Sequence, residues 1–386
     1  MSEVEIELFP AKAGDCVLIT FQEIDYRILI DGGFKDTFEN SLASSLKKLG
    51  AQGKKIDLLV VTHIDNDHIM GIIALLEALE RGNLQIEIGE IWYNGYEHLF
   101  TGRKKQISPN DEKSVFDEVC KLNVVCETNV RGMDIGYSQG QTLTELLEKR
   151  WKQKWNCHYK GNAVYSSTDA VSLSAPYLLA HVLNPGKCEL ENLEKKWNQF
   201  LDIKYLPEEK GDSLRYGTAF ERFCSSENNK EYFLKSKKAK RFASGTNDPS
   251  VTNKSSIALY LEYTSKKSKR YRLLFLGDAV AEQCLERIPQ WDRIKFDCVK
   301  LPHHGSDKNI TTETIKALYA DNVLFSTDGQ KHDHPNLDVL LEFARSEKCK
   351  RMIFNYDCDE KLKRLREEYS EKEVRVGENG YYRLEL

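Results

Sequence analysis

Several features that would assign a protein to a membrane or secretory class are missing from this sequence of 386 residues. The N-terminal segment MSEVEIELFP lacks the basic stretch followed by an apolar stretch that marks a secretory signal. No apolar run reaches the roughly 18 residues that a membrane-spanning helix needs. An excess of one charge is also missing, because 56 basic and 60 acidic residues leave a net charge of -4. These absences predict a cytoplasmic protein without membrane contact, in which any affinity for nucleic acid must be local.

Paired cysteines are missing as well. The ten cysteines are scattered along the chain, and no two of them form a Cys-x-x-Cys pair. In a chain of this size without a secretory signal, such cysteines are expected to be reduced and mostly buried. Cys16 lies in a turn-like segment, residues 13–16, and core packing is the favoured interpretation for it too. The sequence therefore argues against a disulfide framework and a cysteine-rich zinc ribbon.

Histidine, in contrast, is clustered. Three of the nine histidines, His98, His158 and His181, stand alone and are expected to be surface or core residues. The other six occur in three short polar segments, each of which follows or interrupts an apolar, strand-like run. These six are His63, His68, His303, His304, His332 and His334.

The densest histidine segment follows the apolar run 56–61. It places His63, Asp65, Asp67 and His68 within six positions. A strand followed by a tight turn can direct alternate side chains into one cleft, and neutral imidazole with carboxylate binds divalent transition ions. Without a cation the two aspartates would repel each other, whereas one or two dications would stabilise them. The segment therefore predicts a metal site at a strand exit.

The apolar pattern along the chain predicts alternating strands and helices, and therefore an α/β fold built as a sandwich with helices outside. One domain over residues 1–386 is expected, with insertions at about 95–155 and 187–250. Strands are predicted at 4–9, 16–21, 26–30, 58–61, 88–93, 170–174, 181–183, 257–263, 271–276, 296–301, 322–326, 352–355 and 381–386. Helices are predicted at 38–49, 70–82, 113–121, 140–152, 311–320, 336–347 and 359–369.

The second insertion carries a basic run with aromatic residues beside it. Such a run is usually a solvated loop or helix face. It could also contact nucleic acid, because lysines meet phosphates and aromatic rings stack on bases. Both interpretations remain open for Lys235, Lys237, Lys238, Lys240 and Arg241, which lie near Tyr232, Phe233 and Phe242.

The motifs together resemble the metallo-β-lactamase fold hydrolases, whose signature is His-x-His-x-Asp-His followed by single ligands at later strand ends. Asp65 stands where that signature has its second histidine, which is similar to the subgroup typified by the C-terminal domain of the competence protein ComEC. The same subgroup is indicated by the segments 30–33, 275–278, 300–306 and 334–335, which occur in the matching order. The resemblance covers most of residues 4–386 and implies an αββα sandwich of two mixed sheets with helices outside.

The resemblance also implies how the ligands divide between two metal ions. One ion would be held by Asp67, His68 and either His303 or His304, with His303 preferred because it comes first at the strand exit. The other would be held by His63, Asp65 and Asn253, and Asp278 would bridge the two. Asn253 is a weak ligand that stands where many members have a histidine. This oxygen-rich half-site favours Mn²⁺ or Mg²⁺, or Zn²⁺ in one position only, so one or two ions per chain are expected. Asp31 resembles the family's structural aspartate, and capping of a glycine turn is an equal alternative for it.

A site of this kind suits phosphodiester cleavage, because bound metal ions make hydroxide available and neutralise charge on a phosphoryl oxygen. Asp67 or Asp278 would accept the proton of the attacking water, and His334 would serve as the general acid, with His332 a weaker candidate. Ser306 and the basic run 235–241 are the candidate substrate contacts.

The leading hypothesis is a metal-dependent nuclease acting on DNA or RNA. The resemblance suggests a role in a bacterial defence system, with a protein partner or an oligomer. The alternatives are a hydrolase of a small phosphodiester, ester or lactone, and a non-catalytic scaffold that binds a partner.

Overall fold

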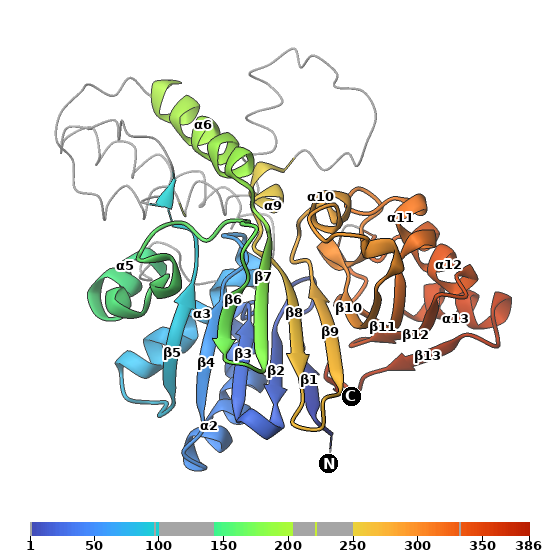
Figure 1. Ribbon diagram of the computed structural model, residues 1–386, viewed down its shortest axis with the longest axis horizontal. Coiled ribbons are helices and arrows are strands. Elements are labelled where there is room, and N and C mark those ends of the chain that lie inside the picture. Colours follow the sequence, from blue (N-terminus) through green and yellow to red (C-terminus); the bar gives the residue numbers. More distant parts are fainter. Residues whose placement is uncertain (1, 96–97, 100–142, 204–220, 222–249, 332) are drawn as a thin grey trace.

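The computed structural model describes residues 2–95, 98–99, 143–203, 221, 250–331 and 333–386, which form two mixed β-sheets facing each other (Figure 1). The first sheet has the strand order β14 (Tyr382–Glu385), β1 (Val4–Leu8), β2 (Val17–Phe21), β3 (Tyr26–Ile30), β4 (Lys55–Val60) and β5 (Glu87–Trp92). The second has the order β13 (Glu373–Val376), β12 (Cys349–Phe354), β11 (Tyr319–Phe325), β10 (Lys295–Lys300), β9 (Arg270–Phe275), β8 (Ala258–Thr264), β7 (Leu178–Asn184) and β6 (Val171–Ser174).

The apolar side chains of the described residues form three layers of core. Because side chains alternate between the two faces of a strand, Leu58 and Val60 of β4 pack between the sheets, whereas Leu59 and Val61 pack on the helical side. Residues from both sheets, such as Ile19 and Leu261, share the middle layer. Both sheets are therefore buried on two faces.

Helices cover the outer faces (Figure 1). Buried residues of α3 (Asn66–Glu80) and α5 (Leu143–Leu146) belong to the core on the outer face of the first sheet, with α1 (Lys35–Thr37) and α2 (Ala43–Ala51) nearby. The second sheet is covered by α10 (Ala281–Leu285), α11 (Thr312–Ala317), α12 (Leu337–Arg345) and α13 (Asp359–Glu368). Two further helices, α6 (Lys187–Ile203) and α9 (Val251–Lys254), lie between β7 and β8 in the chain. No helix among the described residues is long and apolar enough to cross a membrane.

The predicted α/β sandwich with helices outside is confirmed. The described elements that were not predicted include α6, α9, α10 and β13. The helix predicted over 311–320 ends at Ala317, and residues 319–320 already belong to β11. The predicted helix 140–152 is helical from Leu143 to Trp151, and the predicted helix 113–121 lies outside the described residues.

One edge of the sandwich collects the polar residues. Strands β3, β4 and β5 run parallel, as do β9, β10, β11 and β12, so the loops that leave these strands lie at a common edge of their sheet. Strands β2 and β8 are antiparallel to their neighbours and therefore begin at that edge. Two hydrogen bonds join the sheets there: the Ile257 N–H donates to the Thr62 carbonyl at 2.8 Å, and the Ser326 hydroxyl donates to the Gly14 carbonyl at 2.9 Å.

Candidate metal centre

Asp31, which follows β3, fixes the orientation of two other residues. The Thr62 N–H donates to its Oδ1 at 2.7 Å, and the Thr62 hydroxyl donates to its Oδ2, also at 2.7 Å. The same Oδ2 lies 2.8 Å from Nδ1 of His68, in the first turn of α3. A carboxylate can only accept, so His68 Nδ1 carries the proton and Nε2 faces the centre without a hydrogen-bond partner. This arrangement is typical of a metal-binding imidazole.

Helix α3 can present His68 because it packs closely against the end of β3. A Cβ atom on Gly71 would lie 1.9 Å from the carbonyl oxygen of Gly32, so only glycine permits this approach. Asp67 lies in the first turn of the same helix, where the helix dipole stabilises a negative charge.

His63 is held by two hydroxyl groups. Its Nδ1 lies 3.0 Å from the Thr62 hydroxyl oxygen and 3.1 Å from that of Ser256. Because the Thr62 proton is donated to Asp31, Thr62 can only accept from His63, which again leaves Nε2 without a proton. Burial, together with the charge of His68, lowers the pKa of His63 to about 4. The ring is therefore neutral at neutral pH and available to bind a cation.

His304, which follows β10 of the second sheet, also has its Nδ1 held by the protein. Its Nδ1 lies 2.8 Å from the carbonyl oxygen of Ser326, which can only accept, so Nε2 again lacks the proton. Nε2 is buried without a hydrogen-bond partner, 3.8 Å from Asp67 Oδ2 and 3.9 Å from Asp278 Oδ2.

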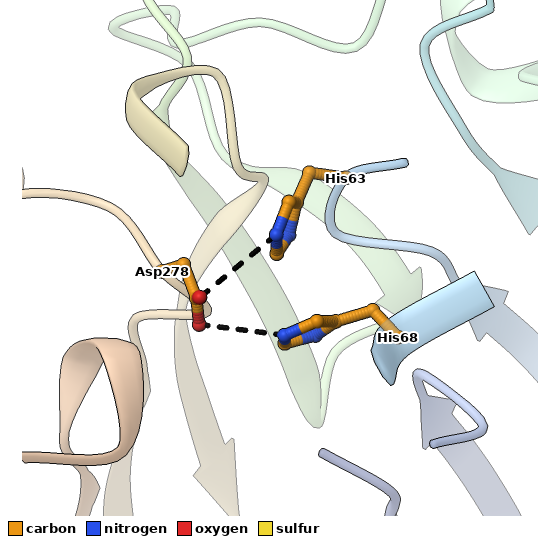
Figure 2. A group of neighbouring side chains, drawn as sticks. All are labelled: His63, His68 and Asp278. Atoms are coloured by element: carbon orange, nitrogen blue, oxygen red, sulfur yellow. Dashed lines mark ion pairs between the residues drawn. The ribbon is translucent and has the colours of Figure 1, made fainter. Parts of the chain in front are cut away.

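The carboxylate of Asp278, just after β9, lies at the centre of these rings. Its Oδ1 is 3.5 Å from Nε2 of His68, and its Oδ2 is 3.9 Å from Nε2 of His63 (Figure 2). Two ligand atoms that share one ion are roughly 3–4 Å apart, because each metal–ligand bond is about 2.0–2.3 Å long. A buried polar atom without a partner costs about 1–3 kcal/mol, and a cation among these atoms would relieve that cost. The residues present therefore fit a divalent metal ion.

The charges at the centre also favour a cation. Burial opposes ionisation of Asp278, but the imidazoles of His68, His303 and His304 hold its pKa well below the usual range. Burial likewise opposes a charge on His68, yet the carboxylates of Asp278, Asp31 and Asp67 raise its pKa well above the usual value. The negative potential that retains a proton on this ring would also attract a metal ion.

Among the described residues, most of the predicted ligands lie in two overlapping groups. In the first, ligand atoms of Asp67, His68 and His304 lie within 4.8 Å of one another, and in the second those of His63, His68 and Asp278 do. Asp65 Oδ2 lies 3.8 Å from Nε2 of His63 and so extends the second group. The centre thus contains His63, Asp65, Asp67, His68, Asp278 and His304, with His303 facing Asp278.

The structure gives three of the predicted site residues specific surroundings. His304 lies in one group with Asp67 and His68, whereas His303, which the sequence favoured, faces Asp278. Asn253 accepts from the Ser250 hydroxyl at 2.8 Å, and its Nδ2 lies 3.4 Å from Nδ1 of His303, so its amide contacts other protein groups. Ser306 is fully buried and its hydroxyl accepts from the Lys308 N–H, so it stabilises a turn and is not accessible to substrate.

Of the remaining candidates, His334 is buried next to the centre, and the others lie outside the described residues. His334 packs against His303 with ring centroids 5.1 Å apart, next to the centre. His332 and the basic residues Lys235, Lys237, Lys238, Lys240 and Arg241 lie outside the described residues. The isolated histidines have structural contacts: His158 pairs with Glu90, His181 with Glu262, and His98 packs on Trp155.

Sequence reasoning missed a buried ion pair next to the centre. Lys300, the last residue of β10, pairs with Asp15, whose Oδ1 lies 3.6 Å from Nδ1 of His304. Gly14 allows this loop to approach α3, because a Cβ there would lie 1.9 Å from the Asp67 carbonyl oxygen. Both residues of the pair stand in segments that the motifs had marked, 13–16 and 300–306, but neither residue type suggested a partner.

We expect Asp31→Asn to weaken metal binding. The amide would lose the charge that holds the proton on His68 Nδ1, and loss of such an outer partner typically lowers metal affinity about 10–100-fold. Titration of the chelator-treated protein with Mn²⁺ measures this change. Asp57→Asn is the matched control, since Asp57 accepts from the Arg27 N–H on the same sheet, away from the centre. Equal affinities of Asp31→Asn and the wild type would refute the assigned role.

Comparisons with known proteins give a family model that matches part of the chain and a set of distant structural neighbours. Residues 10–82, which include the His63–His68 segment, match the model of the Metallo-beta-lactamase superfamily. No curated protein sequence matches the chain. The crystal structure of Tm1679, a metal-dependent hydrolase of the beta-lactamase superfamily, is 9% identical with a TM-score of 0.39, and the alignment covers 99% of each chain.

Two other solved structures align less completely. Yeast long-form RNase Z is 10% identical with a TM-score of 0.34, over 91% of this chain and 36% of that one. The metallo-beta-lactamase MIM-1 from Novosphingobium pentaromativorans is 10% identical with a TM-score of 0.28, over 77% and 76% of the two chains. All three TM-scores are below 0.5. Residues 10–82 of this chain are similar to the Metallo-beta-lactamase superfamily.

Proposed function

We propose that this protein is a metal-dependent phosphodiesterase that cleaves nucleic acid, with DNA as the first substrate to test. The observation that carries the proposal is the convergence of imidazole Nε2 atoms on Asp278, each with its other ring nitrogen held by the protein. Divalent ions bound here would lower the pKa of a coordinated water and offset charge on a phosphoryl oxygen. Mn²⁺ is the proposed ion, with Zn²⁺ and Mg²⁺ as alternatives and one or two ions per chain.

The side chains at the centre divide into a buried and an open set. The rings of His63, His68 and His304 are buried, whereas the carboxylates of Asp65 and Asp67 are 29% and 28% exposed. Substrate would therefore meet the carboxylates first, and Asp67 is placed to accept a proton from an attacking water. Asp278, deeper in the centre, is the alternative acceptor.

His334 is the proposed proton donor to the leaving oxygen. Its ring packs against His303, and an imidazole can donate a proton near neutral pH. The resemblance to the ComEC-like subgroup supports DNA as the substrate, and the basic run 235–241 would track its backbone. A role in bacterial defence, with a protein partner or an oligomer, is proposed on the same resemblance.

We expect the purified protein to cleave DNA in the presence of Mn²⁺. Asp67→Ala should lower this activity at least about 100-fold. Loss of a residue that only orients a metal ligand typically costs about 10–100-fold, and loss of a ligand itself should cost more. Plasmid, single-stranded DNA and RNA would be incubated in parallel with Mn²⁺, Mg²⁺ or Zn²⁺. Asp57→Asn serves as the control for a general effect of acidic substitutions.

The same assay separates the alternatives. Equal cleavage by wild type and Asp67→Ala would mean that the activity is a contaminant. Intact nucleic acid alongside turnover of a small phosphodiester, ester or lactone would favour the small-substrate hydrolase. Failure to bind metal, below about 0.2 ions per chain after loading, would favour the partner-binding scaffold.

A further inference from the structure

The two adjacent histidines after β10 have different neighbours. Both have left-handed backbone conformations, with φ of 45° at His303 and 57° at His304. Their ring centroids lie 5.8 Å apart, with an angle of 69° between the ring planes. Nε2 of His303 lies 3.7 Å from Asp278 Oδ2, and Nε2 of His304 lies 3.9 Å from the same oxygen. Both rings therefore face the shared carboxylate.

The second neighbour of each ring distinguishes them. His304 faces Asp67 and belongs to the group that contains His68. His303 instead lies beside Asn253, whose Nδ2 is 3.4 Å from its Nδ1. Asn253 stands at the position where the superfamily resemblance leads us to expect an imidazole. His303 thus lies on the side of the centre where Asn253 lies, and its Nε2 shares Asp278 Oδ2 with Nε2 of His63, which is 3.9 Å from that oxygen.

Asn309 determines the tautomer of His303. Its Nδ2 donates to the Asp278 carbonyl at 2.9 Å, which fixes the orientation of the amide. Its Oδ1 therefore faces His303 Nδ1, at 2.9 Å, and can only accept. Nδ1 therefore carries the proton, and Nε2 faces Asp278. The contact with Asn253 at 3.4 Å is longer and weaker, so the contact with Asn309 decides the tautomer.

We propose that His303 replaces the missing imidazole and completes a second half-site with His63, Asp65 and Asp278, and that Asn309 is the positioning residue for His303. His304 remains with Asp67 and His68 in the first half-site. The proposal rests on the proposed metal-dependent function, and it adds that each half-site has two imidazoles. A half-site of this composition suits Mn²⁺ or Zn²⁺ better than Mg²⁺.

The test is a count of bound ions. The full chain is stripped with a chelator and dialysed against rising concentrations of Mn²⁺ or, separately, Zn²⁺, and the metal per chain is measured by mass spectrometry. We expect two ions for the wild type and one for His303→Ala, with unchanged affinity for the ion that remains. Asn309→Ala should weaken the same ion about 10–100-fold, as expected for an outer partner.

His304→Ala is the matched variant, and it should weaken the ion held by Asp67 and His68 instead. Two ions bound to His303→Ala with wild-type affinities would overturn the proposal, and so would a wild type that binds only one. Circular dichroism checks that each variant is folded. If His303→Ala is unfolded, the bound ions are counted in His303→Gln, which keeps a polar side chain. If the wild type cleaves DNA but binds its ions equally well without His303, only the role assigned to His303 is refuted. If the wild type binds two ions, one of which depends on His303, but does not cleave nucleic acid, only the proposed nuclease activity is refuted.

Discussion

Asp278→Ala is expected to abolish metal binding at both half-sites and to reduce hydrolysis to background. Its carboxylate lies 3.5 Å from Nε2 of His68 and 3.7–3.9 Å from Nε2 of His63, His303 and His304. Without its charge the centre keeps the imidazoles but loses the anion that faces all of them. Mass spectrometry of the loaded protein should find less than about 0.2 ions per chain, given the affinities usual for such sites.

If Asp278 is shared by both half-sites, its removal should affect both ions, whereas removal of a residue of one half-site should affect one ion. The effect should exceed that of His303→Ala or His304→Ala, each of which leaves one half-site. Asp297→Ala is the control, because Asp297 accepts from the Arg272 N–H within the second sheet, away from the centre. Because the ionised Asp278 carboxylate pairs with the buried His68 ring, the chelator-treated variant should melt below the treated wild type, and circular dichroism checks that it is still folded. Two ions in Asp278→Ala would contradict the bridging role.

The fold could be predicted largely because its strands are short apolar runs that end in glycine and polar residues. Where that pattern was weak, the prediction failed. Helix α6 lies in a charged stretch that was interpreted as part of an insertion, although Leu190 and Leu193 pack into the core of the first sheet. Helix α10 has only five residues, and β13 (Glu373–Val376) has no fully buried side chain, so neither stands out from its surroundings.

The candidate ligands of the centre could be picked out in the sequence because imidazole and carboxylate side chains cluster at strand exits. Their arrangement was not visible. The choice between His303 and His304 depends on two left-handed residues, and a sequence does not reveal positive φ outside glycine. The residues that fix the tautomers, Asn309, Ser326 and Ser256, are common residue types that act through single hydrogen bonds. They could be recognised only once the fold had brought them to the rings.

Lys300→Ala is expected to destabilise the protein by about 3–5 kcal/mol, the usual cost of removing one partner of a buried ion pair. The side chains of Lys300 and Asp15 are 2% and 3% exposed, and Lys300 opposes the effect of burial to hold the pKa of Asp15 below its usual range. Removal of the lysine leaves a buried carboxylate without its cation. The free energy of unfolding would be measured by urea denaturation of the chelator-treated protein, so that loss of metal does not contribute.

Two further variants assign the cause of that destabilisation. Lys295→Ala makes the same substitution on the same strand, but the Lys295–Asp321 pair is exposed, with side chains 38% and 24% accessible, and should contribute at most about 1 kcal/mol. The double variant Asp15→Asn/Lys300→Met removes both charges and should recover most of the stability, because an apolar replacement of a buried pair is often neutral. If the double variant were as unstable as Lys300→Ala, packing of the lysine stem would be the cause. Recovery in the double variant would instead assign the destabilisation to the buried Asp15 charge left without its partner, where the pair joins the loop before β2 to the end of β10 beside His304.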